Sequence, residues 1–214
     1  MLVNLYINLY LYIYIMNHLG GVFYINLDKR PDRKAEIETE LNNIGLKYER
    51  FSAVDMKPGL VGCGYSHIEV LKLARDRGLK NVLIFEDDFQ LLVSKEEFWE
   101  SINNFFKSNI QYDVLMLSYN LFDSSPVDDL LIKIKAAQTT SGYIVNSYFY
   151  DTLIDLWEES QVELIRTNEH WVYGLDQIWK TIQPQNNWYA FKKRLGRQRP
   201  SYSDISETFL DRDV

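Results

Sequence analysis

Three consecutive carboxylates, Glu86, Asp87 and Asp88, follow the unbroken apolar run at residues 82–85. Such a run is typical of a strand buried on both faces of a mostly parallel sheet. Because adjacent acids repel one another, they favour a divalent cation at the strand's carboxyl end, where open α/β sheets bind ligands. Strand alternation predicts that Glu86 and Asp88 project to one side and Asp87 to the other. The triplet predicts a metal site for a phosphate-bearing ligand; a solvated acidic turn is the alternative.

Residues 26–33 join an expected strand to an expected helix and read Asn-Leu-Asp-Lys-Arg-Pro-Asp-Arg. The proline suits the first position of a helix. Arg30 and Arg33, beside this helix N-terminus, could grip a diphosphate. They could equally hold the loop through ion pairs with its own aspartates, because charged turns after strands are common.

Residues 62–67, Gly-Cys-Gly-Tyr-Ser-His, predict a flexible loop before a helix that Ser66 and Glu69 would cap. Gly64 would let the backbone approach a ligand closely. His67, in the first helical turn, could donate a hydrogen bond to a phosphate or a hydroxyl. The alternative is a tight capped loop in which His67 is only structural.

Two segments of the second half carry further candidate groups. Asp176 lies at an expected helix start between two tryptophans, and it suits either a general base or a favourable N-terminal helix acid. Residues 192–204 contain five basic side chains, among them Arg194 and Arg197, in an otherwise acidic chain. This tail suits a lid over a diphosphate, and a solvated basic tail is the alternative.

The composition limits the class of protein. The 214 residues are 46% hydrophobic and 25% charged, as expected for one globular domain. The net charge of −7 argues against nonspecific nucleic-acid binding, which needs a basic surface. The single cysteine, Cys63, excludes an internal disulfide and a cysteine-based zinc cluster. We therefore expect a cytoplasmic protein and no nucleic-acid partner, with membrane association left open.

Residues 1–19 form an atypical N-terminal extension to a single domain expected over residues 20–214. Residues 2–16 alternate Tyr, Ile, Leu and Asn without Lys or Arg. A signal peptide needs a basic start, and a membrane span needs about 20 apolar residues. An extra edge strand, a poor membrane anchor and a translated leader before Met16 are the three interpretations, and the leader is favoured.

The rest of the chain alternates strand and helix patterns, which predicts an α/β fold with a mixed, mostly parallel sheet flanked by helices. The second half is less regular, and its basic tail is expected to fold back without regular structure. The expected strands cover residues 22–27, 48–54, 82–86, 112–118, 130–137 and 144–145. The expected helices cover residues 31–44, 66–78, 94–106, 148–157 and 175–182.

Taken in order, these motifs resemble those of glycosyltransferase family 25, which contains lipooligosaccharide glycosyltransferases and collagen galactosyltransferases. The matching segments are 23–33, 62–67, 83–88, 140–145 and 176–179. The resemblance implies a GT-A type nucleotide-diphospho-sugar transferase fold, a UDP-sugar donor and Mn²⁺ or Mg²⁺. It also implies inverting transfer of a sugar, galactose or glucose, to a hydroxyl of a glycan or glycoprotein acceptor, as in lipopolysaccharide and other glycan biosynthesis.

The resemblance also implies roles for individual residues. Asn26, Asp28 and Arg33 would lie against the nucleotide, and Glu86 would contact the ribose. The residues singled out above by their own chemistry complete the group expected to bind the donor: Arg30, Gly64, His67, Arg194 and Arg197. The metal would lie on Asp88 and Glu86, and Asp176 would act on the acceptor. Related enzymes often complete the metal site with a late histidine, which this chain lacks after His170. Gln198, Ser203 or water would have to substitute for it.

Two other functions fit parts of the same pattern. The same carboxylates could serve a metal-dependent hydrolase of phosphodiesters or nucleotides, but three histidines are few for a two-metal centre. The 14% aromatic content could mark a non-catalytic carbohydrate-binding module, although core packing accounts for most aromatic side chains.

Overall fold

The computed structural model describes residues 18–203 and 208–211. The expected extension at residues 1–19 therefore lies outside the described residues, except for its last two. The helices are α2 (Pro31–Asn43), α3 (Gly59–Asp76), α4 (Lys95–Lys107), α5 (Tyr150–Thr167), α6 (His170–Tyr173) and α7 (Leu175–Ile178), with 3₁₀ turns η1 (Ser147–Phe149) and η2 (Trp179–Thr181).

The strands of the main sheet are β1 (Gly21–Asn26), β2 (Glu49–Ser52), β3 (Asn81–Glu86), β5 (Val114–Met116), β6 (Asn120–Pro126), β7 (Leu131–Gln138), β8 (Gly142–Asn146) and β9 (Trp188–Phe191). Their order is β2-β1-β3-β8-β5-β9-β7-β6. Strands β7 and β8 run against the other six. This confirms the expected α/β fold with a mixed, mostly parallel sheet flanked by helices, and it fits the GT-A type.

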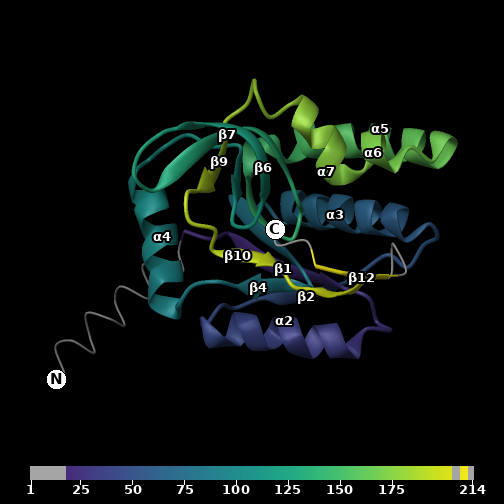
Figure 1. The fold of residues 1–214 in the computed structure, drawn as a ribbon, viewed down its shortest axis with the longest axis horizontal. Coiled ribbons are helices and arrows are strands. Elements are labelled where there is room, and N and C mark those ends of the chain that lie inside the picture. Colours follow the sequence, from purple (N-terminus) through teal and green to yellow (C-terminus); the bar gives the residue numbers. More distant parts are fainter. Residues whose placement is uncertain (1–17, 204–207, 212–214) are drawn as a thin grey trace.

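Two apolar cores lie on the two faces of this sheet (Figure 1). Helices α3 and α5 pack on one face, where Leu71 and Trp157 are fully buried. Helices α2 and α4 cover the other face through Leu41 and Phe98. All the apolar residues of β3 are buried, as its unbroken apolar run predicted.

Several helix ends follow from local sequence. Helix α2 begins at Pro31, and Gly45 follows its end with a φ of 74°, a value that glycine adopts without strain. Helix α4 begins after Ser94, whose side chain accepts a hydrogen bond from the Glu97 amide. Both helix starts were predicted from sequence.

Helix α3 differs from the prediction because it begins at Gly59 and includes Gly62 and Gly64. The prediction of a flexible loop at residues 62–64 is therefore wrong, because these residues lie within the helix. A Cβ on Gly62 would lie 2.3 Å from the Val54 carbonyl oxygen, so this glycine lets the helix pack closely on the chain after β2. Ser66 does not cap the helix; its hydroxyl bonds the Gly62 carbonyl and accepts the Val54 amide hydrogen.

The C-terminal tail folds back as expected, but it contains strands. Strand β10 (Gly196–Gln198) pairs with β4 (Phe89–Leu91), directly after the acidic turn. Strand β11 (Ser201–Ser203) pairs with β12 (Thr208–Leu210). The tail is therefore joined by backbone hydrogen bonds to the segment that follows Asp88.

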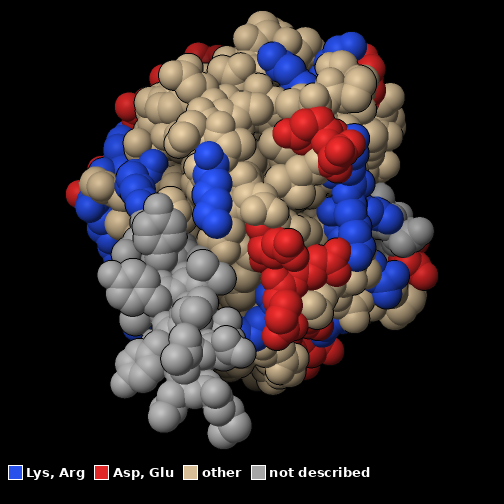
Figure 2. Space-filling view, turned by 90° about the vertical axis from the view of Figure 1, so that its left-hand side faces the viewer, with Lys and Arg blue, Asp and Glu red and all other residues tan. Residues whose placement is uncertain are grey.

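The surface that Figure 2 shows carries acidic and basic side chains in several patches, some of which adjoin, among uncharged side chains. Over the described residues of this face, no continuous basic surface forms. Within residues 18–203 and 208–211, no helix is both long enough and apolar enough to cross a membrane.

Candidate functional site

A cavity of about 430 Å³ opens at the carboxyl ends of β1 and β3. These neighbouring parallel strands bring Ile25 opposite Glu86, so the loops that follow them meet at one sheet edge. The start of α3, the start of α7, residues 139–140 and the tail at residues 198–201 complete the lining. The volume lies in the range of small-ligand sites. The position is the one predicted for a ligand in an open α/β sheet.

Glu86, the last residue of β3, faces α3. His67 lies fully buried in α3, with Nδ1 2.7 Å from the Tyr143 hydroxyl and Nε2 3.2 Å from Glu86 Oε1. Thr140 donates a 2.5 Å hydrogen bond to the same Glu86 oxygen. Burial alone would raise the pKa of Glu86, but the hydrogen bonds from His67 and Thr140 lower that pKa below its usual value.

Asp87 and Asp88 form the turn after β3 and face α2 instead. Arg33 Nη1 lies 2.9 Å from Asp87 Oδ1 and 3.4 Å from Asp88 Oδ2. The prediction that Asp87 and Asp88 point to opposite sides is therefore wrong, because strand alternation ends at Glu86. Asn26 also donates a 2.7 Å hydrogen bond to Asp87.

Asp88 is the least compensated acid of the triplet. Burial and the nearby negative charge of Glu86 raise the pKa of Asp88 to about 7, although Arg33 opposes the shift. Gln198 donates a 3.0 Å hydrogen bond to Asp88 Oδ2. The other oxygen, Oδ1, is buried without a hydrogen-bond partner among the described residues. An unpartnered buried carboxylate oxygen is costly, so the site favours an additional cation or donor.

The tail closes the α2 side of the cavity. Arg33 Nη2 donates hydrogen bonds of 2.7 Å to Ser201 Oγ and 2.8 Å to the Tyr202 carbonyl. Arg199 also lines the cavity, and its guanidinium pairs with Glu36 and Glu40 of α2. The tail is thus tied to both α2 and the acidic turn.

Asp176 lies in the first turn of α7 and lines the cavity. Its Oδ2 accepts a 3.3 Å hydrogen bond from the Thr139 amide, and Thr139 precedes the threonine that contacts Glu86. The cavity therefore brings Asp176 and the acidic turn together, although Asp176 follows Asp87 by 89 positions in the sequence.

Five residues expected at the donor site are absent from the cavity lining: Asp28, Arg30, Gly64, Arg194 and Arg197. Asp28 accepts hydrogen bonds from Arg50 and Ser52, and these lower its pKa. Arg30 pairs with Asp32.

The other three residues, Gly64, Arg194 and Arg197, lie in other parts of the fold. Gly64 faces α5, where an added Cβ would lie 2.4 Å from Gln161. Arg197 bonds the Gln90 side chain at 3.0 Å. Arg194 lies in the loop before β10. Of the basic tail, Arg199 rather than Arg194 or Arg197 reaches the cavity, because the pairing of β10 with β4 sets which residues face the acidic turn.

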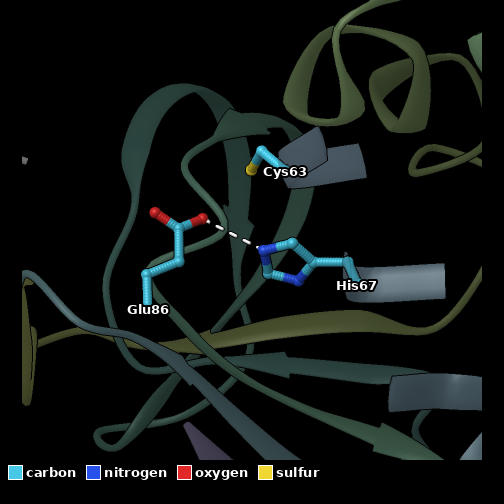
Figure 3. A group of neighbouring side chains, drawn as sticks. All are labelled: Cys63, His67 and Glu86. Carbon is cyan, nitrogen blue, oxygen red and sulfur yellow. Dashed lines mark hydrogen bonds and ion pairs between the residues drawn. The ribbon is translucent and has the colours of Figure 1, made fainter. Parts of the chain in front are cut away.

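Sequence reasoning also missed Cys63 as part of the site. Cys63 lines the cavity one helical turn before His67, and their ligand atoms lie within 4.8 Å of one another and of a Glu86 oxygen. Figure 3 shows Cys63 and His67 projecting from α3 toward Glu86. Burial and the negative charge of Glu86 raise the pKa of the Cys63 thiol. The spacing of four residues would have indicated this pair had the segment been recognised as helical.

The residues at the acidic turn fit a hard divalent cation. Mg²⁺ and Mn²⁺ prefer oxygen ligands. Asp88 offers its unpartnered buried Oδ1, and Glu86 lies in the same cavity. Gln198, whose amide nitrogen bonds Asp88 Oδ2, also carries an amide oxygen and lines the cavity. A cation there would offset the charge that raises the pKa of Asp88.

Two curated relatives match the chain, and no family model matches it. A Drosophila pseudoobscura pseudoobscura "Glycosyltransferase 25 family member" is 27% identical over 210 residues, which cover 82% of this chain and 32% of that protein. A Drosophila melanogaster protein of the same description is 26% identical over 161 residues, covering 60% and 26%. The chain thus spans about a third or less of the length of these relatives.

Among solved structures, one described as a glycosyltransferase involved in the glycosylation of the major capsid of PBCV-1 is similar at a TM-score of 0.47 and 10% identity. The match covers 87% of this chain and 95% of that one. The fold assignment rests on the strand order and directions given above. The sequence comparisons confirm that this chain resembles glycosyltransferase family 25.

Proposed function

We propose that this protein is a glycosyltransferase that uses a UDP-sugar donor and a divalent cation. The observation that carries the proposal is the buried, unpartnered Asp88 Oδ1 in a cavity that also contains Glu86 and Asp176. The resemblance to glycosyltransferase family 25 supports transfer of a sugar over the alternatives. The proposed donors are UDP-galactose and UDP-glucose.

Asp88, Glu86 and Gln198 would hold Mn²⁺ or Mg²⁺. When bound, the cation would stabilise negative charge on the departing diphosphate as a Lewis acid. Asn26 and Arg33 line the cavity at the end of β1 and the start of α2, and they would contact the nucleotide. Arg199 takes the place proposed for Arg194 and Arg197 as the tail residue nearest the phosphates.

Asp176 is proposed as the general base. Its carboxylate would take the proton of an acceptor hydroxyl as that oxygen bonds to the anomeric carbon of the donor sugar. The bond between that carbon and the phosphate oxygen breaks, and UDP leaves with the electron pair. Attack opposite the leaving group inverts the configuration. Closure by the tail would exclude water, which otherwise competes as acceptor.

The acceptor is proposed to be a glycan or glycoprotein hydroxyl. A cytoplasmic location is proposed from the single cysteine and from the absence of an Asn-x-Ser/Thr acceptor in the sequence. The remaining alternatives are a metal-dependent phosphodiesterase or nucleotide hydrolase and a non-catalytic carbohydrate-binding module.

The test measures UDP released from UDP-galactose and UDP-glucose with Mn²⁺, for the full chain and for Asp88→Asn. We expect slow release that the variant reduces at least about 100-fold, because it removes a charge that holds the cation. Asp151→Asn is the matched control. The Asp151 carboxylate is exposed on α5 and pairs with Arg75, so the variant should release UDP as fast as the wild type.

Two outcomes would overturn the proposal. Cleavage of simple phosphodiesters without use of any UDP-sugar would favour the hydrolase. Failure of UDP and UDP-sugars to raise the melting temperature, together with no release of UDP, would favour the binding module.

A further inference from the structure

We propose that Cys63, His67 and Glu86 form a zinc site inside the cavity, next to the oxygen site at Asp88, with which it would share Glu86. One sulfur, one imidazole nitrogen and one carboxylate oxygen lie within 4.8 Å of one another (Figure 3). A small movement of these side chains would bring all three within bonding distance of one ion. Zinc takes such mixed ligands in a tetrahedral arrangement.

The ligand types distinguish this site from the proposed Mn²⁺ or Mg²⁺ site. Thiolate and imidazole favour Zn²⁺, whereas Mn²⁺ and Mg²⁺ favour oxygen. A single cysteine excludes a cluster built from cysteines, but it permits a mixed site. Because all three residues line the cavity, the fourth coordination position would face the cavity and take water or a ligand oxygen.

Hydrogen bonds with residues that are not ligands already orient two of the three proposed ligands, His67 and Glu86. The Tyr143 hydroxyl lies 2.7 Å from His67 Nδ1, so it can accept the Nδ1 hydrogen and leave Nε2 directed at the ion. Thr140 holds Glu86 Oε1 at 2.5 Å. Metal-ligating histidines and carboxylates in proteins are usually supported in this way.

The helix is also fixed on both sides of the thiol. Gly62 approaches the Val54 carbonyl and Gly64 approaches Gln161, with added Cβ atoms at 2.3 and 2.4 Å respectively. These close contacts set the rotation of α3, which places Cys63 and His67 on the face toward the cavity. Binding would release the thiol proton to solvent as the bond between zinc and sulfur forms.

Co²⁺ provides the test, because it replaces Zn²⁺ and its bond to sulfur gives a charge-transfer absorption band. Cys63 is the only cysteine in the sequence, so any such band in the full chain reports Cys63. We expect one equivalent of Co²⁺ to produce the band and Zn²⁺ to remove it by displacement. Cys63→Ser should abolish the band while circular dichroism shows an unchanged fold.

Tyr143→Phe and Asp55→Asn form the matched pair. Tyr143→Phe keeps all three ligands but loses the support behind His67, so Co²⁺ should bind about 10- to 100-fold more weakly. Asp55 lines the same cavity and pairs with Lys29, and its substitution should leave Co²⁺ affinity unchanged. Absence of the band in the wild type, or a band unaffected by His67→Gln and Glu86→Gln, would overturn the proposal.

Discussion

The two sides of the acidic turn stabilise their carboxylates differently. On the α3 side, Glu86 accepts hydrogen bonds from His67 and Thr140, and its pKa is lowered. On the α2 side, Asp87 and Asp88 share one guanidinium, that of Arg33, and the pKa of each is raised. Two hydrogen bonds to one oxygen therefore compensate Glu86 more fully than one shared guanidinium and a single amide hydrogen bond each compensate Asp87 and Asp88.

This difference identifies the carboxylate that would gain most from a cation. Asp88 is buried, lies near the charge of Glu86, and has an oxygen without a partner among the described residues. Glu86 has its donors from the protein itself. Substitutions on one side of the turn at a time therefore separate the two forms of compensation.

The largest effect is expected on the α2 side. Arg33→Met would leave Asp87 and Asp88 without their shared cation, and breaking a buried ion pair typically costs about 3–5 kcal/mol. The free energy of unfolding should fall by that amount at pH 8. At this pH, protonation of the two carboxyl groups offsets the loss of the guanidinium least. Urea denaturation with a chelator present measures the change.

Arg166→Met is the control for this substitution. Arg166 pairs with Glu163 one turn away on α5, and its side chain is 67% exposed. Exposed pairs of this kind contribute about 0–1 kcal/mol. Equal losses for Arg33→Met and Arg166→Met would show that the acidic turn does not depend on Arg33.

A second effect is expected in the pH dependence of stability. The pKa of Asp88 is raised from 3.8 in the unfolded chain to about 7, so the folded protein binds more protons between these values. The free energy of unfolding should therefore fall as the pH rises from about 5 to 7, by up to about 1.4 kcal/mol per pH unit. Measurement requires metal-free protein.

Asp88→Asn tests the source of this slope. The variant should lose most of the slope and keep a smaller part from Asp87, whose pKa is also raised. Glu86 acts in the opposite direction, because its pKa is lowered: its contribution is lost only as the pH falls below its unfolded value of 4.5. An unchanged slope between pH 5 and 7 in Asp88→Asn would assign the effect to other groups.

Much of the fold could be predicted from the sequence because strong local patterns dominate it. The apolar run before Glu86, the proline of α2 and the cap at Ser94 each specify an element with little help from distant residues. The segment at residues 62–64 misled because its glycines indicate a loop by propensity, while tertiary packing requires them in a helix.

The candidate site was less predictable, because its members come from distant segments. Local motifs indicated Glu86, Asp88, His67 and Asp176, and the cavity brings these together. The choice of Arg199 over Arg194 depends on the register between β10 and β4, and a basic run carries no information about register. Likewise, the partners of Asp28 and Arg30 are set by the neighbouring strand and the turn.

The smallest of the three effects is expected on the α3 side, where packing rather than charge sets the geometry. Gly64→Ala would place a Cβ 2.4 Å from the Gln161 side chain, so this fully buried side chain or one of the helices α3 and α5 must shift. Such overpacking typically costs about 1–3 kcal/mol, measured as the loss in the free energy of unfolding in urea. Gln161→Ala should relieve the clash, so the double variant should be more stable than the sum of the single losses implies. Strict additivity would contradict close packing here and, with it, the idea that this contact sets the rotation of α3 that aims His67 at Glu86.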